Sequence, residues 1–225
     1  MAWDTRFPAS SPWTPEPAGA RYIEFPGPLA APGTYRVSMA TRVNGQISAM
    51  GEPQSFTVTP IGGRGQPGAS LDEVIAFTRD LDDLNRQVAG AGAAIKSLLT
   101  ETRAIKKTLL RSAAPDSLRN HARALELELL ALEQKLSGNE ARDLYGDLGP
   151  VSVSRRLGVA MLGTFRSTYG PTQTHQAVVQ IARKDFADVK TRIQRINDTD
   201  MPALQTELNQ AGVPWTPGRG VPGGD

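Results

Sequence analysis

The chain has 225 residues, which allows one or two domains with a hydrophobic core, and it contains no cysteine. Disulfides and thiolate metal sites are therefore excluded. Its 25 basic and 23 acidic side chains leave a formal net charge of +2, too small to predict binding to nucleic acid or to anionic lipid. No apolar run reaches the length of about 18 residues that crosses a membrane, so we expect no membrane insertion. The first residues lack the apolar core of a signal peptide, which predicts a soluble chain that stays where it is made.

Residues 1–60 predict a proline-rich segment followed by a small antiparallel β region. Seven prolines within residues 1–32 favour extended, irregular backbone. Residues 35–39 alternate apolar and polar side chains with the period of a half-buried strand, and residues 55–58 do the same. Asn44-Gly45 between them favours a type I′ turn, and residues 20–25 offer one further strand. Three or four strands are fewer than the seven of an immunoglobulin sandwich, so we expect an incomplete immunoglobulin-like β region.

A glycine-rich linker over residues 61–69 precedes a long helix. Ser70 followed by Glu73 forms a capping box, which predicts a helix start there. Apolar residues then recur at coiled-coil spacing until about Ser112. One seam position holds Leu81, Val88, Ile95, Thr102 and Leu109, and the other holds Phe77, Leu84, Ala91, Leu98 and Ile105. Gly90 and Gly92 permit either a bend or a close helix contact.

The residues that flank this seam decide between two architectures. A two-stranded coiled coil places charged residues beside its seam. Here most of the flanking positions are small, uncharged or apolar, such as Gly92, Ala94 and Leu99. A wide apolar face of this kind favours several neighbouring helices from the same chain, which predicts an intramolecular antiparallel bundle. Homodimerisation through a leftover face of the first helix is the alternative.

Three further helices are predicted after the first. Pro115-Asp116 opens the second helix, which ends at residues 137–139, and a shorter, glycine-marked helix follows Pro150. Residues 171–172 begin the last long helix, which residues 200–202 either kink or cap and Gly212 ends. The fold class is therefore α+β: a small antiparallel β region, then a bundle of three to four long helices over residues 70–211. Residues 212–225 form an irregular tail rich in proline and glycine.

Catalytic, cofactor-binding and metal-ligating residues are not predicted. The glycines of residues 62–68 lack the Gly-Lys-Ser/Thr ending of a phosphate loop and indicate a flexible linker. His121 and His175 have no partner at metal-ligand spacing. The carboxylates, including Asp82-Asp83 and Glu126 with Glu128, lie on helices opposite the apolar stripe, which indicates solvated faces.

Two polar-aromatic clusters near the ends of the chain predict contacts that pin the termini. Residues 3–7 read Trp-Asp-Thr-Arg-Phe and residues 215–219 read Trp-Thr-Pro-Gly-Arg. Tryptophan and arginine cover apolar surface while keeping a polar group available for hydrogen bonding. The aromatic residues therefore indicate that the proline-rich start is held against another part of the chain.

These clusters belong to an ordered set of segments that resembles a known family. The set comprises residues 3–7, 27–28, 32–37, 170–174 and 211–219. It is similar to the C-terminal region of bacterial proteins with sortilin/Vps10-like or BNR-repeat β-propellers, which are often labelled glycosyl hydrolases. The resemblance covers nearly the whole chain and departs from the family pattern in the glycine-rich linker.

The resemblance implies immunoglobulin-like strands and a helical tail that follow a propeller, and a periplasmic or extracellular location. The hydrolase label attaches to the propeller, so no catalytic residue is carried over to this chain. The first hypothesis is a non-catalytic structural or interaction module that associates with a β-propeller in the same or another chain. The alternatives are participation in glycoside hydrolysis and a homodimerising helical scaffold.

Overall fold

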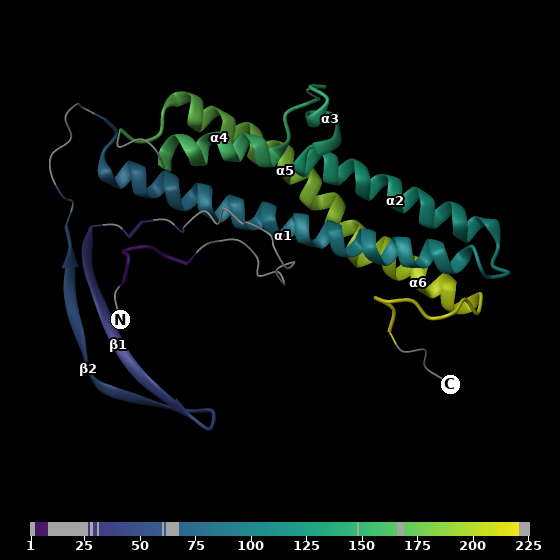
Figure 1. Ribbon diagram of the computed structural model, residues 1–225, viewed down its shortest axis with the longest axis horizontal. Helices are drawn as coiled ribbons and strands as arrows, with labels where there is room; N and C mark the ends of the chain where they lie inside the picture. Colours follow the sequence, from purple (N-terminus) through teal and green to yellow (C-terminus); the bar gives the residue numbers. More distant parts are fainter. Residues whose placement is uncertain are drawn as a thin grey trace.

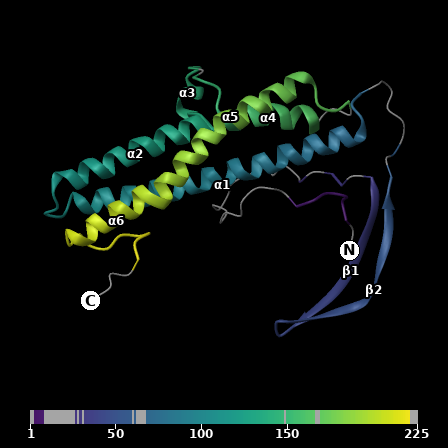
Figure 2. The same ribbon diagram turned by 180° about the vertical axis from the view of Figure 1, so that it is seen from behind.

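The computed structural model describes residues 3–8, 27, 29–30, 32–59, 61, 68–147, 149–165 and 169–220. A two-stranded antiparallel sheet precedes an elongated bundle of helices, which confirms the predicted α+β class (Figure 1). The sheet lies beside the bundle end at which the first helix begins, and it is a layer separate from the helices in both views (Figures 1 and 2).

The two strands, β1 (Gly33–Val43) and β2 (Gln46–Val58), form a long hairpin. Asn44 and Gly45 have φ angles of 50° and 84°, as the predicted type I′ turn requires. Within the described residues the sheet has only these two strands, and Arg6 and Leu29 add one isolated bridge. The described part therefore contains no sandwich of two sheets. The further strand expected at residues 20–25 lies outside the described residues.

The helices begin and end close to the predicted boundaries. The capping box of Ser70 and Glu73 is present at the start of the first helix, as predicted. A five-residue helix after Asn139 was not predicted; the side chain of Asn139 accepts a hydrogen bond from the backbone N–H of Arg142 and starts it. The α-helices are α1 (Leu71–Leu109), α2 (Asp116–Ser137), α3 (Glu140–Leu144), α4 (Val153–Phe165), α5 (Gln173–Arg195) and α6 (Met201–Gln210).

Three rows of helix make up the bundle. The 39 residues of α1 form one row of about 58 Å at 1.5 Å per residue. α5 and α6 form a second row of similar length, and the third row is α2 followed by α4, which both run opposite to α1 (Figure 1). Because α2 is too short to match α1, α4 covers the part of α1 and α5 that α2 leaves open.

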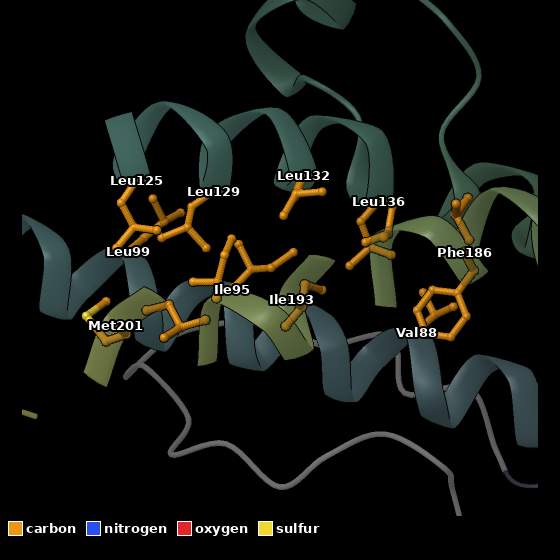
Figure 3. Close-up of a cluster of buried hydrophobic side chains, with 14 of the residues drawn as sticks. Val88, Ile95, Leu99, Leu125, Leu129, Leu132, Leu136, Phe186, Ile193 and Met201 are labelled. Atoms are coloured by element: carbon orange, nitrogen blue, oxygen red, sulfur yellow. The ribbon is translucent and has the colours of Figure 1, made fainter. Parts of the chain in front are cut away.

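The core lies between these rows and uses the predicted stripe. Side chains of α1, α2 and α5 point toward one another in Figure 3, with Ile95, Leu129 and Ile193 among them. Every seam residue from Leu81 to Leu109 except Ala91 is buried, and Ala91 is half-buried, so the stripe packs within one chain. Leu99, a flanking residue, is also buried, in accordance with the wide apolar face expected from the sequence. The hydroxyl of Thr102 donates to the carbonyl of Leu98 at 2.7 Å, which satisfies the one polar seam residue.

A π-helical turn, η1 (Ile196–Asp200), joins α5 to α6 without a loop. Pro202 has no backbone N–H and disfavours regular helix at this point. The wider turn closes instead by a hydrogen bond from the N–H of Met201 to the carbonyl of Ile196. The wider turn keeps the apolar faces aligned, because Ile196 and Met201 are both buried although they are five residues apart. The sequence predicted that residues 200–202 either kink or cap the last helix. The structure instead has a π-helical turn at this point, after which α6 begins at Met201.

The described tail residues fold back on the bundle through Arg219. This side chain is buried, and its guanidinium donates to the carbonyls of Val213 (3.3 Å) and Pro214 (2.9 Å) and to the side chain of Asn209. The indole N–H of Trp215 donates to the carbonyl of Arg219 at 2.9 Å. The described tail residues 213–220 form neither helix nor strand, as expected. Side-chain hydrogen bonds nevertheless hold this part of the tail in a defined conformation.

Candidate functional site

The hairpin is amphipathic, because directly opposed residues share a face and successive residues alternate between faces. We call one side the apolar face; its apolar members are Tyr35, Val37, Met39, Val43, Met50, Phe56 and Val58, and the same side also carries Thr41, Gln46, Ser48 and Gln54. We call the other side the arginine face and define it by Thr34, Arg36, Ala40, Arg42, Ile47, Ala49, Ser55 and Thr57.

Most of the apolar face is exposed. Met39 is 63% exposed, Val43 65% and Met50 50%, although side chains of this kind are usually buried. The sequence predicted half-buried strands at residues 35–39 and 55–58. Tyr35 and Val58 are half-buried as expected, whereas Val37 and Met39 are exposed, because no other described element packs on them. Met39 and Met50 lie directly opposite each other, whereas the polar pair Thr41 and Ser48 separates them from Val43. An exposed apolar pair of this kind is a candidate interaction site.

Trp3 covers the end of the apolar face that is farther from the turn. The indole ring lies 5.4 Å from the ring of Tyr35 and 5.8 Å from that of Phe56, in tilted and edge-on arrangements. Its N–H donates to the carbonyl of Arg6 at 2.8 Å, and Arg6 donates to the carbonyl of Gly27 at 3.0 Å. The N-terminal cluster therefore pins the start of the chain to the hairpin, and none of the described residues covers the part of the face nearer the turn.

β2 is irregular in the middle of the hairpin. Val37 lies opposite Gln54 and Met39 lies opposite Met50, so that Ser38 faces the three residues 51–53. Gly51 has a φ of 73°, a left-handed conformation that glycine adopts without strain. Pro53 in the same bulge has no backbone N–H to donate. The extra residues of the bulge lie on β2, a strand of 13 residues, whereas the 11 residues of β1 contain no extra residue.

The hydrogen bonds of both histidine side chains are made within the helical part of the chain. The ring of His121 is 3.4 Å from the carboxylate of Glu207, across α2 and α6. His175 accepts a hydrogen bond from the backbone N–H of Thr172 and completes the N-terminal cap of α5. Among the described residues, no three side chains of the histidine, cysteine, aspartate or glutamate type gather as a metal site would require.

The carboxylate of Glu126 connects two helices, so its interpretation as part of a solvated face is wrong, whereas Glu128 stays partly exposed at 35% while it pairs with another helix. Glu126 accepts hydrogen bonds from Lys106 and Arg103 of α1, and its side chain is only 15% exposed. The hydrogen bond from Lys106 lowers the pKa of Glu126 below its usual value, and burial opposes this effect. Glu128 pairs with Arg192 of α5 at 2.7 Å. These two carboxylates stabilise contacts between α2 and its neighbours.

A hollow of about 840 Å³ lies between the end of α2 and the start of α4. Arg142, Arg155 and Arg156 line it together with Asp143 and Asp185. Arg155 and Arg156 lie 3.8 Å from the carboxylates of Asp143 and Asp185, so its charges largely compensate one another. The exposed hairpin is accordingly the stronger candidate for a functional surface.

Comparison with protein-family models, with curated proteins and with solved structures gives no match to this chain. None of the described helices is both long enough and apolar enough to cross a membrane. The candidate surface therefore has to be argued from its own residues. The alternation of apolar and polar residues at positions 35–39 was the signal for this surface in the sequence. Sequence reasoning missed that Met39, Val43 and Met50 have no cover among the described residues.

Proposed function

We propose that this chain is a non-catalytic interaction module whose hairpin docks onto a partner through the apolar face. The observation that carries the proposal is the exposure of Met39, Val43 and Met50 on one side of a two-stranded sheet. An isolated hairpin is marginally stable in water, and packing against a further layer supplies the missing burial. The partner would provide that layer.

The composition of the helical core supports a docking role for the hairpin. The core is made by α1, α2, α4, α5 and α6, and the exposed hairpin strands contribute no residue to it. The core of the bundle is thus formed without the two hairpin strands. A module of this design presents a docking element without depending on it for folding.

We propose a β-propeller domain, in the same chain or in another, as the partner. The resemblance of the ordered segments to propeller-containing proteins supports this choice. The apolar face supports it as well, because a partner built of β-sheet offers a flat layer against which a second sheet packs at about 10 Å. No hydrolytic step is assigned to this chain.

The test is binding of a purified β-propeller domain of the sortilin or BNR-repeat type to the full chain, measured by titration calorimetry. The variant Met39→Thr/Met50→Thr replaces one opposed pair on the apolar face and keeps residues that favour strands. The control Ala40→Thr/Ala49→Thr changes the neighbouring opposed pair on the arginine face. We expect the first variant to weaken binding at least tenfold and the control to bind like the wild type.

Both variants should keep the helical circular dichroism and the unfolding midpoint of the bundle, since neither touches its core. Equal binding by both variants, or no binding of the propeller by the wild-type chain, would contradict the proposal.

Dimerisation through α1 is a separate hypothesis, and the mass of the wild-type chain in light scattering tests it. The burial of the α1 stripe within one chain predicts a monomer at that seam.

A further inference from the structure

We infer that the outer edge of β1 accepts an extended strand of the partner that carries acidic side chains on one face. This inference rests on the proposed docking role of the hairpin and specifies its chemistry. A hairpin has two outer edges, and each presents unpaired backbone N–H and C=O groups to a further strand. The two edges of this hairpin are not equivalent.

The edge of β2 is a poor template for pairing. Its bulge at residues 51–53 places extra residues opposite Ser38, and Pro53 cannot donate a hydrogen bond. The edge of β1 runs through 11 consecutive strand residues without such an interruption. No described residue pairs with it, since the described sheet consists of β1 and β2 alone.

The turn determines which backbone groups of β1 point outward. In a hairpin with a two-residue turn, the pair that flanks the turn exchanges both backbone hydrogen bonds, and the next pair exchanges none. Val43 and Gln46 flank the turn here. The N–H and C=O groups of Arg42 and Ala40 therefore point away from β2, toward the position of an added strand.

The charge on β1 defines the partner strand. Arg36 and Arg42 are the only ionisable side chains of β1 apart from Tyr35, and both are exposed on the arginine face. Neither guanidinium forms an ion pair within the described part of the chain. They are six positions apart, which is about 20 Å along a strand. A complementary strand carries Asp or Glu at two positions six residues apart, with apolar residues on its other face.

A second copy of this chain fits the edge less well. Antiparallel pairing of β1 with its own copy, with the apolar faces on the same side, brings arginines directly or diagonally opposite each other, which is unfavourable. Packing two apolar faces together covers a ribbon about 37 Å long and 10 Å wide, or about 700 Å² in total. Stable interfaces bury about 1,200–2,000 Å², so the hairpin alone does not supply a dimer interface. A strand from a larger partner sheet covers both the edge and the adjoining face.

The test uses the full chain labelled with ¹⁵N and synthetic 13-residue peptides as probes. The first peptide alternates valine and threonine and carries glutamate at two positions six residues apart on the threonine face. The second carries lysine at these positions, and the third has proline at its centre. We expect the glutamate peptide to bind about tenfold more tightly than the lysine peptide, because each cross-strand charge pair contributes up to about 1 kcal/mol. Added salt should reduce this difference.

The amide signals identify the edge. We expect the peptide to shift and protect the N–H groups of Ala40 and Arg42 and to leave the outer edge of β2 unchanged. Ala40→Pro removes one outward N–H and should abolish binding, whereas Ala40→Thr keeps that N–H and should bind like the wild type. Bundle stability is measured for both variants, so that a folding defect is not mistaken for a loss of the edge.

Several outcomes would overturn the inference. Binding that is independent of peptide charge, or protection along β2, would assign the site elsewhere. Protection of Ala40 and Arg42 in the isolated monomer would mean that this chain covers its own edge, with residues 20–25 as a candidate; the same protection with a doubled mass would indicate a second copy. If Ala40→Pro leaves propeller binding intact while Met39→Thr/Met50→Thr abolishes it, docking uses the apolar face alone. That result refutes the edge inference and leaves the proposed function standing.

Discussion

Replacing Leu129 by alanine tests whether the three rows of helix share one core. Leu129 lies in the middle of α2, is fully buried and points into the cluster formed with α1 and α5 (Figure 3). The change removes about three methylene equivalents from the core, or roughly 2.4 kcal/mol of transfer free energy. The cavity left between two long helices adds to this loss, so we expect a total of about 3–4 kcal/mol.

Leu127→Ala is the matched control, since Leu127 lies two residues earlier in α2 and is 57% exposed. It should change the free energy of unfolding by less than about 0.5 kcal/mol. Urea and thermal unfolding followed by helical circular dichroism measure both variants. The core variant should lose about 10 °C in its unfolding midpoint, given about 2–4 °C per kcal/mol for a chain of this size. Equal losses for the two variants would refute the assignment of the core face of α2.

Two further predictions concern charged residues. The pKa of Glu126 is lowered chiefly by the hydrogen bond from Lys106, so its carboxylate stabilises the fold above its ordinary pKa of 4.5, and this contribution is lost as the pH falls below that value. Glu126→Gln should therefore reduce stability by about 1 kcal/mol at pH 7 and by much less at pH 3, and a constant difference in urea unfolding across this range would contradict the linkage. Arg219→Lys should loosen the tail, because an ammonium group cannot make the forked contacts to the carbonyls and to Asn209; we expect a loss of about 1–2 kcal/mol. Faster hydrogen exchange around Trp215 would report this loosening. Unchanged exchange there would show that the hydrogen bonds of Arg219 do not hold the tail in place.

The sequence alone determined most of the helical architecture. The capping residues Ser70 and Thr172 and the proline at position 115 are local signals, and each lies at a helix start in the structure. The seven-residue spacing of the α1 stripe predicted a packed helix, and the small flanking residues predicted neighbours from the same chain. Such signals can be read locally because capping and helical periodicity depend on residues within one or two turns.

The tertiary structure decided how the helices share their partners. The placement of α4 in line with α2 depends on relative helix lengths and on the connection through α3, which no periodicity encodes. The π-helical turn before Met201 likewise follows from the need to keep two apolar faces in register across Pro202. Glu126 and Glu128 are polar residues in the sequence, and only packing brings cations of other helices to them.

The hairpin also shows which features of the fold the sequence determines and which it does not. The alternation of residues 35–39 and the Asn44-Gly45 turn determined two strands, their antiparallel pairing and the chemistry of each face. Only the tertiary structure decided that Met39, Val43 and Met50 have no covering layer among the described residues. A period of two specifies the side on which an apolar residue lies, but it carries no information about which element packs against that side, because that contact is made by residues distant in the chain or by another molecule.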